Sequence, residues 1–98
     1  MNFENLQLHD ATITSLSYLW EAKALSIVGQ HFSREKGEAV EFTLMFNSVT
    51  GVSIPHCEEW GPSSCINVTG FKVPLTHYIE MQSGDVITIE ATGFKFSA

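Results

Sequence analysis

Apolar residues occupy every second position from Val40 to Phe46, and this alternation constrains the fold more than any other feature of the sequence. Glu41 and Thr43 lie at positions between them. Successive side chains of a β-strand point to opposite faces, so a period of two is typical of an antiparallel strand with one dry face and one wet face. Residues 40–46 therefore predict a strand that borders a hydrophobic core.

Similar short runs recur along the chain and are separated by turn signals. These runs contain many β-branched and aromatic residues, which favour strands. The expected strands are residues 12–20, 25–32, 40–46, 49–54, 65–72, 78–82 and 86–91, with Phe94 and Phe96 in a last short strand or packed over one end.

Residues 75–83 fit two patterns. Their apolar residues have roughly helical spacing and Thr76 could cap a helix, whereas residues 78–82 alternate as a strand does. Residues 83–85 read Ser-Gly-Asp, a tight-turn signal, and residues 86–91 are strongly β-forming. A hairpin is therefore the favoured interpretation, and a short helix is the alternative.

Alternation within residues 12–20 also predicts which side chains face the core. Leu16, Tyr18 and Trp20 share one face of this strand, and Ile13 lies on the other. Because the larger residues are on the first face, we expect that face to be buried.

The segment 65–72 predicts a strand with Ile66 and Val68 on one side and with Cys65 and Thr69 on the other. A cysteine inside an apolar strand is typically a buried, unreactive thiol. We therefore expect Cys65 to be a structural residue.

Short strands, regularly spaced turns and at most one short helix predict an all-β fold. The two architectures that remain open are an antiparallel β-sandwich and a partly open barrel, each built mainly from hairpins. A chain of 98 residues can bury one modest core without metal or disulfide staples. Residues 1–98 are therefore expected to form a single domain.

The charge balance indicates which partners to expect. Eleven acidic residues against five basic ones give a formal net charge of −6, and the basic residues are scattered. Nucleic acids and anionic membranes need clustered cations, so neither is an expected partner. A basic protein partner is compatible with the acidic surface, which also serves solubility.

The N-terminal residues contain no cationic start followed by an apolar run, and no segment is apolar over the length of a membrane span. A cytoplasmic location is therefore expected. In that compartment Cys57 and Cys65 are expected to be thiols, with a disulfide between them as the alternative.

Residues with catalytic or metal-binding chemistry do not form a recognisable motif. His9 and Asp10 are adjacent, and Asp10 suits a turn in which its carboxylate accepts backbone N–H groups. His56, Cys57 and Cys65 do not have the paired spacing of zinc ligands. We therefore expect no catalytic residue, no metal site and no cofactor.

The loop that follows Pro55 is the candidate binding surface. Large aromatic residues are usually mostly buried, which favours Trp60 as a plug at one end of the sheets. The alternative is that Trp60 is an exposed anchor with Glu58 and Glu59 as a charged rim. The candidate partner-binding residues are Glu58, Glu59, Trp60 and Ser63.

Three short motifs carry a resemblance to a known group of proteins. They are Leu8-His9-Asp10-Ala11, Glu59-Trp60-Gly61-Pro62-Ser63 and Gln82-Ser83-Gly84-Asp85. Together they resemble small, largely uncharacterised bacterial β-rich domains, some of which are similar to immunity proteins of polymorphic toxin systems. The resemblance implies a small cytoplasmic all-β domain that acts by binding, with no cofactor and no active site.

The leading hypothesis is that the chain is a non-enzymatic protein-binding domain. The more specific form of this hypothesis is an immunity-type inhibitor of a basic bacterial toxin. The alternative is a small-ligand or carbohydrate-binding β-sandwich with Trp60 and Tyr78 lining a cleft. An open sheet leaves unpaired edges, so a homodimer through an exposed sheet edge is a further alternative. The third hypothesis is a metal-dependent enzyme that uses His9, Asp10, His56 and His77.

Overall fold

Eight β-strands and one short 3-10 turn form the computed structural model, which describes residues 2–98. The elements are η1 (Phe3–Asn5), β1 (Thr12–Leu19), β2 (Ala24–Ser33), β3 (Glu38–Asn47), β4 (Gly51–Ser53), β5 (Ile66–Lys72), β6 (Thr76–Met81), β7 (Val86–Glu90) and β8 (Gly93–Ser97). They form two antiparallel sheets with the strand orders β1-β2-β3-β8 and β4-β7-β6-β5. The predicted all-β fold is therefore confirmed.

Most of the expected hairpins are present. Residues 75–83 contribute β6, which pairs antiparallel with β7, so the strand interpretation is confirmed over the helix. Phe94 and Phe96 lie in β8, which pairs with β3. The strand expected at residues 49–54 is shorter, because β4 comprises only Gly51–Ser53. No helix within residues 2–98 is long and apolar enough to cross a membrane.

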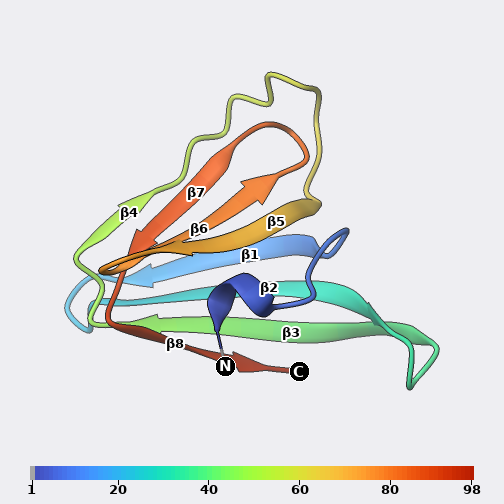
Figure 1. The fold of residues 1–98 in the computed structure, drawn as a ribbon, viewed down its shortest axis with the longest axis horizontal. Helices are drawn as coiled ribbons and strands as arrows, with labels where there is room; N and C mark the ends of the chain where they lie inside the picture. The colour runs from blue at the N-terminus through green and yellow to red at the C-terminus, as the bar shows by residue number, and fades with distance from the viewer. Residues whose placement is uncertain (1) are drawn as a thin grey trace.

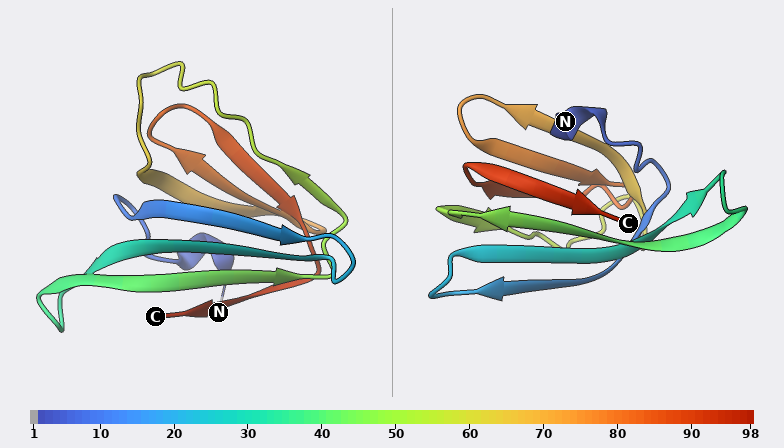
Figure 2. Two further views of the ribbon diagram at one scale, coloured as in Figure 1. Left: turned by 180° about the vertical axis from the view of Figure 1, so that it is seen from behind. Right: turned by 90° about the horizontal axis from the view of Figure 1, so that it is seen from below.

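The two sheets are joined at one corner and separate away from it. Thr12 and Cys65 form an isolated antiparallel bridge, and the backbone N–H of Ile66 donates to the carbonyl of Ala11 at 2.7 Å. In Figure 1, β6, β7 and β4 are inclined more steeply than β1 and fan away from it. The views from behind and from below show the same divergence (Figure 2). The fold is thus a two-sheet sandwich that stays open along part of β1.

The core lies between the inner faces of the two sheets. In β3, the alternation predicted from the sequence is confirmed, since Phe42, Leu44 and Phe46 are all buried. They pack with apolar residues of β2, β6 and β7 in one cluster. Each of these side chains contributes about 1.5–3 kcal/mol when it is fully buried, so this cluster is the main source of stability.

An aromatic group closes the core beneath η1. The buried ring of His77 lies 5.1 Å from the ring of Phe3 and 4.9 Å from that of Phe71, both in edge-to-face geometry. Burial lowers the pKa of His77, and hydrogen bonds to the carbonyls of Ile89 and Leu75 oppose this effect. His77 is therefore a core residue, and its neutral form is the one that packs.

A β-bulge in β1 corrects the face predicted for Ile13. The pairing of β1 with β2 shifts between Ile13 and Ser15, so Thr14 is the extra residue. Ile13 then pairs with Gly29, and Leu16 pairs with Ile27. The two partners, Gly29 and Ile27, are both on the inner face of β2. Ile13 and Leu16 consequently face the same side, whereas strict alternation placed them on opposite sides.

The prediction that the far end of β1 is buried is wrong. Tyr18 pairs with buried Leu25 and so lies on the expected inner face, but it is 38% exposed. Trp20, in the turn after β1, is 82% exposed. The alternation identified the face of Tyr18 correctly, but β1 is an edge strand that diverges from the opposite sheet, so this end has no cover.

A second bulge corrects the faces predicted for β5. The register with β6 shifts between Ile66 and Val68. Ile66 and Thr69 are buried, whereas Val68 is 45% exposed. The predicted pairing of Ile66 with Val68 on one face is therefore wrong, because the extra residue reverses the alternation.

Candidate binding site beneath the 54–64 loop

The chain between β4 and β5 forms the expected loop, and one buried carboxylate holds it in place. Figure 1 shows this loop arching around the tip of the β6–β7 hairpin. Asp85, in that tip, accepts hydrogen bonds from the backbone N–H groups of Cys57 at 2.8 Å and Glu58 at 3.0 Å. The hydroxyl of Ser83 donates to the same carboxylate at 2.8 Å. Asp85 thereby fixes the loop to the hairpin.

These hydrogen bonds also explain the acidity of Asp85. The N–H of Cys57 lowers the pKa of the carboxyl group most, the Ser83 hydroxyl and the N–H of Glu58 add to this, and burial opposes it. The sequence indicated only a turn at residues 83–85. The partners of Asp85 come from a different loop, so its anchoring role had no local signal.

The prediction that Trp60 is buried in the core is wrong. Its side chain is 67% exposed, and its backbone N–H donates to the carbonyl of Ser83 at 3.0 Å. The indole packs against Gly84, where a Cβ atom would lie only 2.9 Å from ring atom Cδ2 of Trp60. Because Gly84 has no side chain, the indole is seated on the outside of the hairpin tip.

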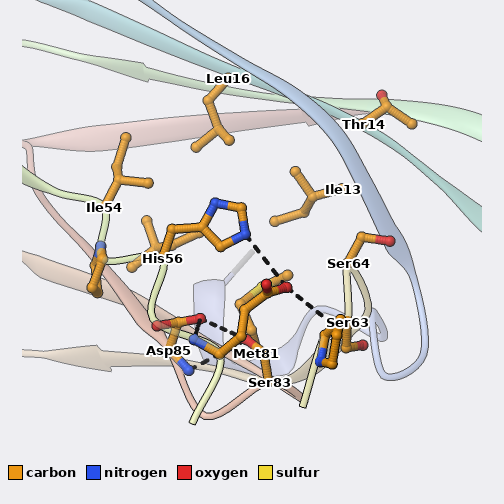
Figure 3. Close-up of a pocket in the computed structure, with 14 residues that line it drawn as sticks. Ile13, Thr14, Leu16, Ile54, His56, Ser63, Ser64, Met81, Ser83 and Asp85 are labelled. Atoms are coloured by element: carbon orange, nitrogen blue, oxygen red, sulfur yellow. Dashed lines mark hydrogen bonds and ion pairs between the residues drawn. The ribbon is translucent and has the colours of Figure 1, made fainter. Parts of the chain in front are cut away.

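A pocket of about 490 Å³ lies on the other side of the loop, where the two sheets diverge. Its floor is apolar and comes from β1, from the start of the loop and from the β6–β7 hairpin. In Figure 3, the ring of His56 lies over the space that these apolar residues surround. The apolar lining residues are Ile13, Leu16, Ile54, Pro55, Pro62, Met81 and Ile87.

The polar wall of the pocket centres on Glu58. Its Oε2 atom lies 3.4 Å from Nε2 of His56 and accepts a hydrogen bond from the backbone N–H of Ser63 at 3.3 Å. The hydroxyl of Ser63 in turn accepts the backbone N–H of Cys65 at 3.1 Å. These contacts hold Glu58 where it lines the pocket.

The structure divides the four predicted partner-binding residues into two pairs. Glu58 and Ser63 line the pocket, whereas Glu59 and Trp60 do not. Glu59, which precedes Trp60 in the chain, is exposed. The outer side of the loop therefore carries an acidic and an aromatic residue. Its inner side carries Glu58 and faces the largely apolar pocket.

Sequence reasoning missed the apolar floor of the pocket. Ile13 and Leu16 were expected on opposite faces, and the bulge at Thr14 brings both into the pocket. Tyr78, expected to share a cleft with Trp60, lies on the outer face of its sheet, where the ammonium group of Lys72 lies 5.9 Å from the centre of its ring.

The four residues of the metal-enzyme hypothesis do not converge. His9 hydrogen-bonds through Nδ1 to the carbonyl of Asn67 at 2.8 Å, and His77 is in the core. Asp10 occupies a turn with φ of 68°, as expected, but its carboxylate accepts the side-chain amide of Gln82 rather than backbone N–H groups. Among residues 2–98, no group of three or more such side chains could hold a metal ion.

Both cysteines are free thiols, and their exposure differs. Cys57 is exposed in the loop, and Cys65, expected to be buried, is only half-buried at the corner where the sheets join. The Oγ1 atom of Thr12 lies 4.0 Å from its sulfur. Cys65 thus has a structural position, although it is closer to solvent than its apolar neighbours suggested.

The comparisons with known proteins support the fold. The sequence matches no protein-family model and no curated protein. Among solved structures, it is similar to the crystal structure of an uncharacterized protein from Neisseria gonorrhoeae. The two chains are 13% identical, the likeness covers 92% of each chain, and the TM-score is 0.57. At this identity the likeness concerns the fold alone.

Proposed function

We propose that this chain is a non-enzymatic protein-binding domain whose partner contacts the 54–64 loop. The observation that carries the proposal is the position of Trp60, whose indole is 67% exposed yet fixed by Gly84 and by a backbone hydrogen bond to Ser83. Tryptophan is enriched among the residues that dominate interface energies, and an immobilised ring loses little entropy on binding. Glu59 supplies a charged rim beside it.

The charges around the loop favour a basic partner. No lysine or arginine occurs between Lys36 and Lys72, whereas Glu58, Glu59 and Asp85 all lie in or under the loop. Such a surface attracts and orients a cationic protein. The specific form of the proposal is an immunity-type inhibitor of a basic bacterial toxin. It is supported by the resemblance of Glu59-Trp60-Gly61-Pro62-Ser63, which forms part of this loop.

The test is capture of partners from a lysate of the native host, quantified by mass spectrometry. Trp60→Ala is compared with Phe32→Ala, because Phe32 is also 67% exposed but lies at the far end of β2. We expect one basic protein to be enriched by the wild type and by Phe32→Ala, and at least tenfold less by Trp60→Ala. Equal capture by all three proteins would contradict the proposal.

A second candidate function is binding of a small apolar ligand in the pocket beneath the loop. The observation that favours it is a volume of about 490 Å³ with an apolar floor and a few convergent polar groups, a composition typical of ligand sites. Since Trp60 does not line the pocket, Trp60→Ala should leave such binding unchanged, whereas Leu16→Trp should block it. Fragment titration followed by NMR distinguishes the two functions.

A further inference from the structure

The open edges of the two sheets differ in how they are protected. β4 is only three residues long, and β8 is five residues long and carries Lys95. The N-terminal segment covers β5, where Thr69 Oγ1 donates to the carbonyl of Phe3 at 3.0 Å and Ile66 N donates to that of Ala11 at 2.7 Å. β1 spans eight residues and contains no charge and no proline. Exposed edges usually carry such protection, so β1 has the edge best suited to accept another strand.

The first part of this edge already has a partner. Ile13 N donates to the carbonyl of Ser64 at 2.9 Å, and Thr12 bridges with Cys65 in antiparallel register. After the bulge, residues 15–19 have no backbone partner on this edge within the part of the chain that the structure describes. The short pairing with residues 64–66 therefore begins a ladder that the protein itself does not continue.

The pocket beneath the loop lies beside this unpaired stretch. Ile13 and Leu16 form its wall on the β1 side, and Ile54 and Glu58 belong to the loop across from them. The side chain of Glu58 is 31% exposed. An extended segment laid along β1 would place every second side chain in this pocket. An apolar side chain would cover Ile13 and Leu16, and a cationic one would meet Glu58.

We propose that the partner binds by strand addition, with an extended segment that pairs antiparallel with residues 15–19 of β1. Its inward side chains combine apolar residues with a lysine or arginine that faces Glu58. Strand addition takes its affinity from main-chain hydrogen bonds and its specificity from pockets for alternate side chains. This inference rests on the proposed function, because the segment belongs to the same protein partner.

Charge favours a segment of another protein over a second copy of this chain. Two copies each carry a net charge of −6, so pairing of their β1 edges would bring like charges together. A basic segment gains from the same charges. Leu19 and Trp20, which are 59% and 82% exposed, extend the apolar surface at the far end of the edge.

The experiment uses the full chain and the synthetic peptide acetyl-Thr-Leu-Thr-Lys-Thr-Leu-amide. Amide hydrogen exchange is measured by NMR at residues 15–19, and affinity is measured by chemical-shift titration. One control peptide has Glu in place of Lys. Another is N-methylated at both leucines and at the lysine, whose N–H groups would face β1 as that of buried Ile66 faces Ala11, so it cannot donate the ladder hydrogen bonds. Glu58→Gln is the matched protein variant, because its amide oxygen can still accept the N–H of Ser63.

We expect the Lys peptide to slow exchange at least tenfold at Leu16 and Tyr18, whose N–H groups face the open edge, and to bind about tenfold more tightly than the Glu peptide. Glu58→Gln should reduce that preference to about twofold. Equal binding of the N-methylated peptide, or no change in exchange, would overturn strand addition. Slowed exchange that depends on protein concentration without peptide would assign the edge to a second copy and also overturn it.

The outcome for the proposed function is read separately. Strand addition alone fails if the peptide does not bind while partner capture still depends on Trp60. The proposed function fails if capture is unaffected by Trp60→Ala, whatever the peptide does. Trp60 does not line the pocket, so peptide binding by Trp60→Ala should match that of the wild type.

Discussion

The indole of Trp60 packs against Gly84, a turn residue with φ of 94°, and this contact places an exposed aromatic side chain of the loop on the tip of a different hairpin. Two properties of Gly84 make the contact possible. A φ of 94° is unfavourable for a residue with a Cβ atom, and the missing side chain leaves room for the ring. Trp60 is therefore presented to solvent in a defined position.

Gly84→Ala should disturb both properties. The new Cβ would lie 2.9 Å from the Trp60 ring at a residue whose φ is unfavourable for alanine. We expect the free energy of unfolding to fall by about 1–3 kcal/mol. We also expect the emission maximum of Trp60 to shift to longer wavelength, measured with Trp20→Phe so that one indole reports.

Gly37→Ala is the matched control for this variant. Gly37 also has a positive φ, of 66°, but a Cβ there would meet nothing within 4 Å. It should lower stability by about 1 kcal/mol from backbone strain alone. If both variants have the same stability and the same emission maximum, the contact between Trp60 and Gly84 does not position the indole.

The hydrogen bonds of Asp85 predict that the 54–64 loop detaches from the β6–β7 hairpin at low pH. The hydrogen bonds from Cys57, Ser83 and Glu58 lower the pKa of Asp85 below its ordinary value of 3.8. The folded state therefore binds this proton less readily than the unfolded state. The stability from the carboxylate is fully present above pH 3.8, and it is lost as the pH falls through the lower folded-state pKa.

The variant that checks this prediction is Asp85→Asn. It should lower the melting temperature at pH 7, speed amide exchange at Cys57 and Glu58, and flatten the dependence of stability on pH below 3.8. Asp10→Asn is the control, since its carboxylate contacts a side-chain amide at the surface. An unchanged exchange rate at Cys57 in Asp85→Asn would show that another contact holds the loop.

The burial of His77 predicts a second loss of folding stability, at a higher pH than the loss caused by Asp85. Burial among Phe3, Phe46 and Phe71 lowers its pKa below 6.5, so the unfolded state binds the proton more readily. The stability that depends on neutral His77 is present above pH 6.5 and is lost as the pH falls through the folded-state pKa. Urea unfolding from pH 8 to pH 5 should show this loss.

His77→Phe should remove that loss, because phenylalanine keeps the edge-to-face packing and does not titrate. His9→Gln removes an exposed imidazole outside the core and is the matched control. A pH dependence that is the same in His77→Phe and in the wild type would assign the effect to a different group.

The strands with regular alternation could be predicted from the sequence, and the bulges could not. Val40 to Phe46 runs without interruption, so its period shows directly which face is buried. In β1 and β5, one extra residue reverses the alternation, and neither Thr14 nor Asn67 differs in kind from an ordinary strand residue. The register is set by the partner strand, which a local pattern does not contain.

The same limit applies to the site. The loop and Glu58, Glu59, Trp60 and Ser63 could be identified, because their composition differs from that of the strands around them. Whether Trp60 is buried depends on Gly84, and the pocket depends on a bulge in a strand far from the loop in the sequence. These are tertiary relationships, so the sequence indicated the residues but not which side of the loop each would occupy.

The bulge itself is supported by a close approach at Gly29. This residue pairs with Ile13 on the inner face, and a Cβ there would lie far inside the contact distance of the Thr12 carbonyl and the Phe42 ring. Neither neighbour can move freely, because Thr12 pairs with Cys65 and Phe42 is in the core. Gly29→Ala should therefore lower the free energy of unfolding by about 2–3 kcal/mol.

Gly51→Ala is the control for Gly29→Ala, since Gly51 is also in a strand but its Cβ would meet only the flexible side chain of Glu90, at 3.4 Å. It should change stability by less than about 1 kcal/mol. Gly29→Ala should also displace Ile13, which pairs with it, and reduce fragment or peptide binding in the pocket. If Gly29→Ala is as stable as Gly51→Ala and the Ile13 methyl signals do not move, β1 does not depend on this close approach for its position.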